Sequence, residues 1–312
     1  MAIALDSEVA AALQAAAATS GVPTATERGD VWTLRAVIDA TLAIDHGKLP
    51  GSTAVRRSDH VVEADDGCAV AMRWYLPDNR VSTSAVVYAH GGGMISGSLE
   101  LYDPVIAHYA ELTGVAFLSV DYRLAPEATG DAPVKDVYAA LAWLVREADA
   151  LGVDRERIAI MGDSAGGGLA AGAAILARDH GMALAHQILI YPMLDSRTLV
   201  PDPHLTATAT WTYDDNFTGW NALLPEGVTV STLSSPSHLD DFADLAPTFI
   251  DVGDLDIFRD ESIDYALRLL RAGVPCELHV RTGAPHAFEW IAPEAAISRR
   301  STEDRYRVIE AL

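Results

Sequence analysis

A serine lies between two glycines at the centre of the chain, where residues 162–166 read Gly-Asp-Ser-Ala-Gly and the serine is Ser164. Residues 157–161 before it are mostly apolar, as in a buried strand, and residues 168–178 after it are small and apolar, as in a helix. Gly-x-Ser-x-Gly between a strand and a helix is typical of a nucleophile elbow, a strained turn that a side chain two residues away would crowd. The helix start would direct free N–H groups at the reacting atoms. The motif alone leaves open a glycine-rich turn with an incidental serine.

Length and composition limit the classes of protein to consider. The chain has 312 residues, half of them hydrophobic, and a formal net charge of −22. That charge repels nucleic acid and anionic membranes, so we expect neither as a partner. The chain contains no apolar run of the roughly 18 residues that a membrane span needs. Acidic residues precede the first basic residue, Arg28, which is the wrong order for a secretory signal, so we expect a soluble cytoplasmic protein.

Strand and helix patterns alternate along most of the chain. The expected strands are 61–63 and 69–75, joined as a hairpin through the turn 65–67, and then 85–89, 115–120, 157–161, 186–191, 247–253 and 276–281. The expected helices are 103–113, 132–150, 168–178, 260–272 and a closing helix over 293–312. This order predicts an α/β fold with a mostly parallel sheet of about eight strands and helices on both faces. Ligands bind such sheets at the carboxyl ends of the strands.

Two segments fall outside this alternation. Residues 1–50 read as two helices, over 7–18 and 30–45, that precede the first strand and are free to cover part of the core. Residues of about 195–240 contain four prolines and several aromatic side chains, which indicates an insertion with one or two helices. We therefore divide the chain into helices in 1–50 and a catalytic domain in 51–312 that carries this insertion. Candidates for the wall of a binding site are Trp32, Trp211, Tyr213, Phe217 and Trp220, although ordinary packing also explains each of them.

A second glycine motif, His90 to Gly93, follows the expected strand 85–89. Three glycines allow backbone N–H groups to converge on one point without obstruction by a Cβ. Such a loop forms an oxyanion hole together with the N–H of the residue after the nucleophile, here Ala165. A flexible glycine turn is the alternative. We expect His90 to fix the loop by hydrogen bonds and not to titrate in catalysis.

An acyl-transfer serine also needs a base and an acid that orients it. Six histidines follow Ser164, and His286 is the one that lies in a loop just past the last strand, where a base reaches the carboxyl edge of the sheet. For the acid, Asp254 and Asp256 both lie in the loop after strand 247–253. Their order along the chain does not choose between them.

Five motifs occur in order: His90–Gly93, Tyr122–Glu127, Gly162–Gly167, Asp256–Glu261 and Pro285–Phe288. Together they resemble the hormone-sensitive-lipase-like carboxylesterases, bacterial type, of the α/β-hydrolase superfamily, over about residues 60–312. The resemblance implies Ser164 as nucleophile, Asp256 as acid and His286 as base.

The same resemblance implies backbone donors and supporting residues. Gly92, Gly93 and Ala165 would donate to the oxyanion, and the supporting residues would be His90, Gly91, Glu127 and Asp163. The family's caps match residues 1–50 and 195–240. The chain departs from the family in two places, with Ile257 in place of the usual proline and Met94 in place of the usual aromatic residue after the glycines. The first leaves Asp254 as a rival acid, and the second suggests a roomier wall beside the oxyanion hole.

These observations predict a serine carboxylesterase that hydrolyses short- to medium-chain acyl esters through an acyl-enzyme. An amidase or lactonase that uses the same triad is the alternative enzyme. A non-catalytic small-molecule receptor of the same fold is the alternative outside the enzymes. We expect no cofactor and no metal, because no Cys/His spacing typical of zinc and no Walker loop occurs. A homodimer through an edge strand near residues 276–282 is expected from the resemblance and from the tendency of exposed edges to pair.

Overall fold

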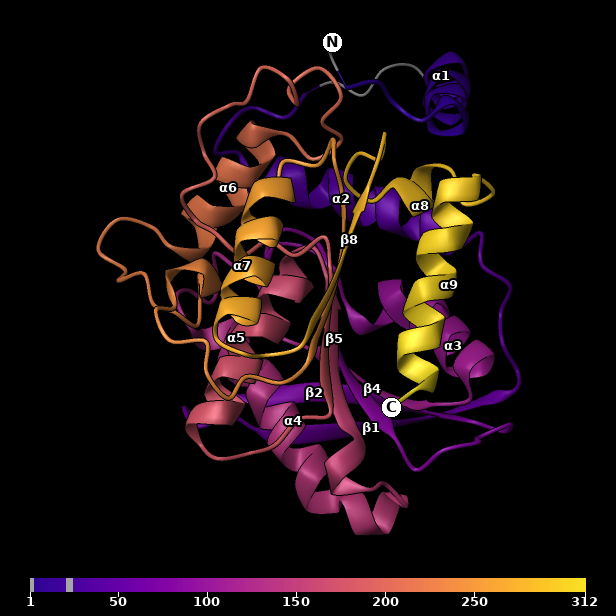
Figure 1. The fold of residues 1–312 in the computed structure, drawn as a ribbon, viewed down its shortest axis with the longest axis vertical. Helices are drawn as coiled ribbons and strands as arrows, with labels where there is room; N and C mark the ends of the chain where they lie inside the picture. Colours follow the sequence, from indigo (N-terminus) through magenta and orange to yellow (C-terminus); the bar gives the residue numbers. More distant parts are fainter. Residues whose placement is uncertain (1–2, 21–24) are drawn as a thin grey trace.

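A computed structural model describes residues 3–20 and 25–312, which form a sheet with helices on both faces (Figure 1). The sheet has eight strands in the order β1-β2-β4-β3-β5-β6-β7-β8. Strand β2 runs antiparallel to its neighbours β1 and β4, and the remaining pairs are parallel, as predicted. The strands are β1 (Val55–Glu63), β2 (Ala69–Pro77), β3 (Ala85–Ala89), β4 (Ala116–Asp121), β5 (Ile158–Asp163), β6 (His186–Ile190), β7 (Thr248–Gly253) and β8 (Cys276–Arg281).

The helices form three groups around this sheet (Figure 1). On one face lie α4 (Ala132–Leu151), α5 (Ala165–Asp179) and α7 (Arg259–Arg271), and on the other lie α3 (Leu99–Thr113), α8 (Phe288–Ile291) and α9 (Ala296–Glu310). Helices α2 (Val31–His46) and α6 (Tyr213–Leu223) lie over the carboxyl ends of the strands, with α1 (Ser7–Ser20) beyond them. None of the helices in the described ranges is long and apolar enough to cross a membrane.

Two helix boundaries differ from the sequence prediction. The closing helix expected over 293–312 is observed as α9, and a separate short helix that was not predicted, α8, precedes it with a break between the two. Pro293 lies in the break, since proline has no N–H to donate and disfavours helical conformation in the residue before it. Helix α3 begins at Leu99, before the predicted residue 103, because the side chain of Ser98 accepts a hydrogen bond from the backbone N–H of Leu101.

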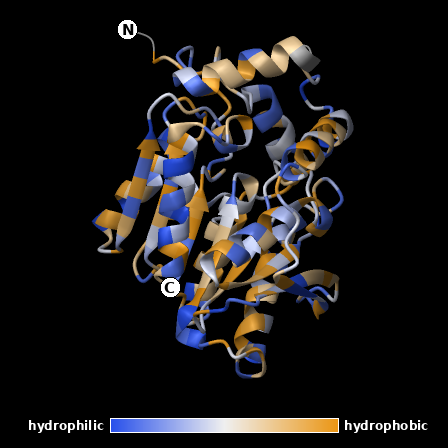
Figure 2. Cartoon of the chain, turned by 90° about the vertical axis from the view of Figure 1, so that its right-hand side faces the viewer, coloured by the Kyte–Doolittle hydropathy of each residue, from blue (hydrophilic) through white to orange (hydrophobic). Residues whose placement is uncertain are grey.

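Strands at the centre of the sheet are apolar on both faces. All residues of β3 and β5 are buried, in keeping with a parallel sheet covered by helices on both sides. The strands are predominantly hydrophobic, whereas the outer helices show hydrophilic residues between hydrophobic ones (Figure 2). This packing makes the sheet a rigid base for the loops at its carboxyl edge.

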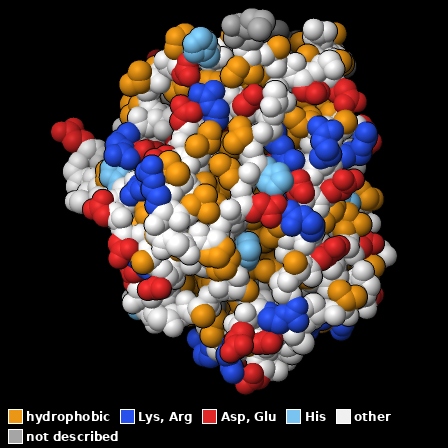
Figure 3. All heavy atoms as spheres, in the orientation of Figure 1, with side chains coloured by type: hydrophobic (Ala, Val, Ile, Leu, Met, Phe, Trp, Pro, Cys, Tyr) orange, Lys and Arg blue, Asp and Glu red, His pale blue; other side chains and the backbone are white. Residues whose placement is uncertain are grey.

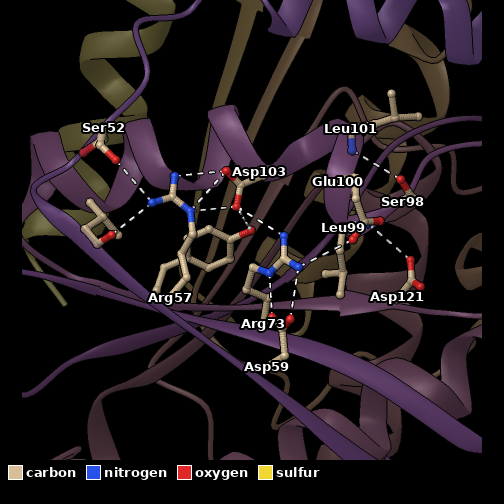
Figure 4. A network of polar contacts seen from close by, with 12 residues as sticks. Ser52, Arg57, Asp59, Arg73, Ser98, Leu99, Glu100, Leu101, Asp103 and Asp121 are labelled. Carbon is tan, nitrogen blue, oxygen red and sulfur yellow. Dashed lines mark hydrogen bonds and ion pairs between the residues drawn. The ribbon is translucent and has the colours of Figure 1, made fainter.

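Ion pairs fasten the β1–β2 hairpin to α3 (Figure 4). Arg57 of β1 donates to Asp103 of α3 at 2.8 Å, and Arg73 of β2 binds both Asp59 at 2.6 Å and Asp103 at 3.4 Å. The hydroxyl of Tyr75 donates to the same Asp103 carboxylate at 3.1 Å. One aspartate therefore joins the antiparallel end of the sheet to a helix on its face.

The two N-terminal helices take different positions. The buried Val9 of α1 shares an apolar cluster with Ala284 and Phe288, whereas α2 packs against α3 and α6. Arg28, just before α2, joins this part of the chain to α6, because it binds Asp214 at 2.7 Å and lies over the ring of Phe217. The insertion contains α6 and a short 3-10 turn at Pro236–His238, in agreement with the one or two helices predicted.

Candidate active site

Ser164 occupies a strained turn between β5 and α5. Its φ of 54° and ψ of −121° are unusual for a residue with a side chain. A Cβ on Gly162 would lie 2.2 Å from the carbonyl oxygen of Gly166. A Cβ on Gly166 would lie 2.1 Å from the carbonyl oxygen of Ala89. Both flanking glycines are therefore required by close backbone approach, as the elbow motif predicted.

The structure brings Ser164, His286 and Asp256 into contact from three different loops. His286 Nε2 lies 3.0 Å from Ser164 Oγ, and His286 Nδ1 lies 2.7 Å from Asp256 Oδ2. A carboxylate only accepts hydrogen bonds, so Nδ1 carries the proton and Nε2 is left to accept from the serine hydroxyl. The three residues are sheltered, with Ser164 and His286 each 7% exposed and Asp256 1% exposed. Of the histidines in the described ranges, His286 is the one hydrogen-bonded to Ser164.

The rival acid, Asp254, has a different partner. Its Oδ1 accepts a hydrogen bond from the backbone N–H of Gly283 at 2.7 Å, and burial raises the pKa of this carboxyl. Asp254 therefore stabilises the turn that leads to His286. The carboxylate in contact with the imidazole is that of Asp256. The second oxygen of Asp256 accepts from the N–H of Phe258 at 3.0 Å, which fixes the orientation of the carboxylate.

Aromatic rings hold the imidazole of His286 from two sides. Tyr191 lies edge-on to it with ring centroids 4.7 Å apart, and Phe258 does so at 5.2 Å. The hydroxyl of Thr210, in the insertion, donates to the carbonyl oxygen of His286 at 2.7 Å. We did not predict these contacts, because residues 191, 210 and 258 are far apart in the sequence and meet only in the fold.

The glycine loop after β3 has the backbone conformation that such a loop needs. Gly92 and Gly93 have φ values of 124° and 62°. The N–H groups of Gly92, Gly93 and Ala165 donate to no other group in the described part of the chain, so they are free to bind a ligand oxygen. Met94 also has a positive φ, and its side chain is fully buried, with Cε near Gly168 of α5.

Asp163, at the end of β5, holds the first part of this loop. Its carboxylate accepts from the hydroxyls of Tyr88 and Tyr102, at 2.7 and 2.9 Å, and from the N–H of Gly91 at 3.0 Å. The side chain beside the nucleophile is thus directed away from it into a buried network. The two tyrosines carry no motif that would have marked them in the sequence.

His90 is enclosed beneath the same loop. Its ring stacks on Tyr122 with centroids 4.2 Å apart, and its Nδ1 lies 2.9 Å from the carbonyl oxygen of Gly91. Burial lowers the pKa of His90 to about 4, so the ring is neutral near pH 7. This geometry agrees with a residue that fixes the loop and does not exchange protons during a reaction.

Glu127 makes its contacts with the N-terminal segment. Its carboxylate receives two hydrogen bonds of 2.6 Å from the guanidinium of Arg35 in α2, and these bonds lower the pKa of the carboxyl. Glu127 therefore joins the loop after β4 to the helix above it. Arg35 was missed in the sequence, where it stands in a mainly apolar helical pattern.

Both the sequence and the fold of this chain match known proteins. Residues 86–290 match a family model described as the alpha/beta hydrolase fold. Carboxylesterase NlhH of Mycobacterium tuberculosis is 36% identical over 253 residues, which cover 78% of this chain and 79% of that protein. This chain belongs to the hormone-sensitive-lipase-like members of the α/β-hydrolase superfamily. It is a carboxylic ester hydrolase.

Other relatives of this hydrolase have the same class of activity in their names. The ethyl acetate hydrolase of Pseudomonas putida is 31% identical over 268 residues, covering 82% of this chain and 81% of the relative. A solved structure titled bacterial heroin esterase superposes with a TM-score of 0.89 and 35% sequence identity, covering 98% of this chain and 97% of that one. The predictions of family, fold and enzyme class are thereby confirmed.

Proposed function

We propose that Ser164 is the nucleophile of this ester hydrolase, with His286 as its base and Asp256 as the acid that orients the base. The observation that carries the proposal is the continuous contact from Ser164 Oγ to His286 Nε2 at 3.0 Å and from His286 Nδ1 to Asp256 at 2.7 Å. His286 takes the serine proton as Oγ attacks the ester carbonyl, and then gives it to the departing alcohol. Water activated by His286 hydrolyses the resulting acyl-enzyme, which releases the acid and restores the serine.

The N–H groups of Gly92, Gly93 and Ala165 hold the oxyanion in both steps. Support comes from their lack of other acceptors in the described ranges and from the bond that joins Gly91 of the loop to Asp163, the residue before the nucleophile. Donors arranged in advance stabilise the charge that develops on the carbonyl oxygen, and each is worth about 100-fold to 1,000-fold in rate. His90, Gly91 and Asp163 support this loop from below.

The N-terminal helices in residues 1–50 and the insertion at about 195–240 form a cap over the site, and residues 51–312 provide the catalytic domain. Within this cap, Trp211 is the aromatic residue best placed to meet an acyl chain. A Cβ on Gly93 would lie 2.6 Å from the six-membered ring of Trp211, so the indole packs directly on the oxyanion loop. Its centroid is also 6.5 Å from that of His286. A large, buried ring at this place restricts the acyl side to short or medium chains.

A series of p-nitrophenyl esters of increasing acyl length tests this activity and the role of Trp211. We expect wild-type kcat/KM to be highest for short or medium chains and to fall for long ones. Trp211→Ala enlarges the acyl side, so the long-chain to short-chain ratio of kcat/KM should rise about tenfold, the lower end of the effect of one methylene group in an apolar pocket. Phe217→Leu is the matched control and should leave this ratio unchanged, because the ring of Phe217 packs against the guanidinium of Arg28. Wild-type rates that rise steadily to long chains would contradict the proposed preference, and faster cleavage of matched p-nitroanilides would indicate an amidase.

We also infer that two copies of the chain associate along β8. Strand β8 is at the edge of the sheet, and the adjoining helix α7 exposes Ile263, Leu267 and Leu270, at 37%, 41% and 54%. These positions share one face of the helix. Hydrophobic side chains are exposed on the side of the molecule where α7 and β8 lie (Figure 3). An open edge beside an apolar helix stripe suits a symmetric partner.

Sedimentation measures this association. We expect the wild-type protein to sediment as a dimer at micromolar concentration and Leu267→Asp to shift it to the monomer, because a buried unpaired carboxylate opposes burial of the stripe. Val61→Asp, on the opposite edge of the sheet, is the control and should remain dimeric. A wild-type monomer at this concentration would rule out the interface.

The cytoplasm is the compartment that we propose for the protein. Cys68 and Cys276 are unpaired in the structure, as suits a reducing environment. The net charge of −22 disfavours nucleic acid and anionic membrane as partners and leaves small esters as the proposed substrates.

A further inference from the structure

Two polar side chains of α2 reach down to the loop that follows β3. Asp39 Oδ1 accepts hydrogen bonds from the hydroxyl of Ser96 at 2.5 Å and from the N–H of Gly97 at 3.1 Å. Arg35, one helical turn earlier, donates through Nε to the carbonyl oxygen of Ile95. Three successive residues of the loop are therefore held by one face of a helix that lies outside the sheet.

The loop itself is strained and needs such external contacts. Gly92, Gly93, Met94 and Gly97 all have positive φ values, and Met94 lacks the freedom of glycine. Backbone in these conformations persists only where the surrounding structure holds it. Inside the loop one backbone bond, from Ile95 N–H to Gly92 O at 3.1 Å, closes the turn.

Close packing transmits the position of Ser96 to the oxyanion donors. A Cβ on Gly92 would lie 2.3 Å from the carbonyl oxygen of Ser96, so these two backbone segments are in direct contact. A shift of Ser96 therefore displaces Gly92, whose N–H points toward the reaction centre in the proposed mechanism. Arg35 adds a second anchor, because its Nη2 donates to the carbonyl oxygen of Ala125 at 2.7 Å, and Ala125 N–H donates to Met94 O at 2.9 Å.

We propose that Asp39 and Arg35 are positioning residues for the oxyanion hole, so that docking of the cap helix on the loop prepares the site for catalysis. The inference rests on the proposed role of Gly92 and Gly93 as oxyanion donors. The hydrogen bonds to an oxyanion are stronger in the transition state than in the bound ester. Misplacing the donors therefore lowers kcat and leaves KM nearly unchanged.

Asp39→Ala is the main test. We expect kcat to fall about 10-fold to 100-fold, a range set by the effect of misplaced catalytic groups, with KM changed less than threefold. Affinity for a trifluoromethyl ketone, which forms an oxyanion on Ser164, should fall by about the same factor as kcat/KM. Affinity for the corresponding secondary alcohol, which has no such charge, should not change. Asp39→Asn should recover part of the activity, since its amide oxygen still accepts from the N–H of Gly97.

Controls separate this effect from general damage to the helix. Asp45→Ala, on the same helix and paired with Lys48 at its end, should match the wild type in kcat and in ketone affinity. If Asp39→Ala does not fold, Ser96→Ala is the substitute, because it removes the loop hydroxyl that donates to Asp39. This variant should also lower kcat. A folded Asp39→Ala with wild-type kcat, or with a raised KM alone, overturns the inference. That result leaves the proposed function intact as long as activity still depends on Ser164.

Discussion

Replacing Ser164 with alanine is expected to lower kcat on p-nitrophenyl acetate by about 10⁵-fold to 10⁶-fold, the scale of nucleophile loss in other serine hydrolases. Without Oγ no acyl-enzyme forms, and hydrolysis depends on water attacking a carbonyl that is held only by the loop donors. Residual catalysis from the oxyanion hole alone is about 10³-fold to 10⁴-fold over water. The variant should therefore remain measurably faster than the uncatalysed reaction.

The measurement combines initial rates with labelling by a fluorophosphonate. Wild-type protein should gain the mass of one label on Ser164, and Ser164→Ala should gain none. Ser58→Ala, which removes an exposed serine of β1 far along the chain from the site, should keep both activity and labelling. Unchanged circular dichroism would show that the Ser164 variant is folded. Activity above about one hundredth of wild type in that folded variant would mean that Ser164 is not the nucleophile.

Replacing Asp256 with asparagine is expected to lower kcat by about 10⁴-fold, as for the orienting aspartate in other triads. The amide nitrogen is a donor, so it favours the imidazole tautomer with the proton on Nε2, which cannot accept the proton of Ser164. The charge that stabilises the imidazolium is lost as well. KM should change much less, because the carboxylate lies behind His286 and does not contact the ester.

Asp254→Asn is the matched control for this result. Asp254 accepts from Gly283 N–H, and an asparagine oxygen still serves that bond, so kcat should stay within about fivefold of wild type. Rates measured for both variants on the same ester decide between the two acids. A larger loss in Asp254→Asn than in Asp256→Asn would reverse the assignment.

Motifs and periodicity were enough to predict the fold class and the kind of site. The alternation of strands and helices set the parallel sheet, and the glycines around Ser164 marked a turn whose crowding the structure displays directly. Both motifs work because they describe local backbone requirements. Glycine is needed where backbone segments approach within the radius of a Cβ, and that need is visible in the sequence as the residue itself.

Contacts between distant segments were beyond what the sequence offered. Asp254 and Asp256 are two residues apart in one loop, and only the folded chain shows that one accepts from Gly283 and the other from His286. Tyr88 and Tyr102 around Asp163 belong to no local pattern. The direction of a side chain in a loop depends on tertiary packing. Residue type and order along the chain therefore could not show which of Asp254 and Asp256 contacts His286.

Helix α2 shows most clearly which features the sequence predicts and which ones only the tertiary structure reveals. Its amphipathic pattern predicted a helix, and the sequence placed that helix outside the βα core. Arg35 and Asp39 stand four residues apart, so they share one face, but their partners at residues 95–97 are nearly sixty positions away. By itself the sequence determined a strained serine turn, a glycine loop and a sheet to carry them, since each follows from local chemistry. Only the tertiary structure decided which acid meets His286 and which helix holds the glycine loop, because long-range packing sets those distances.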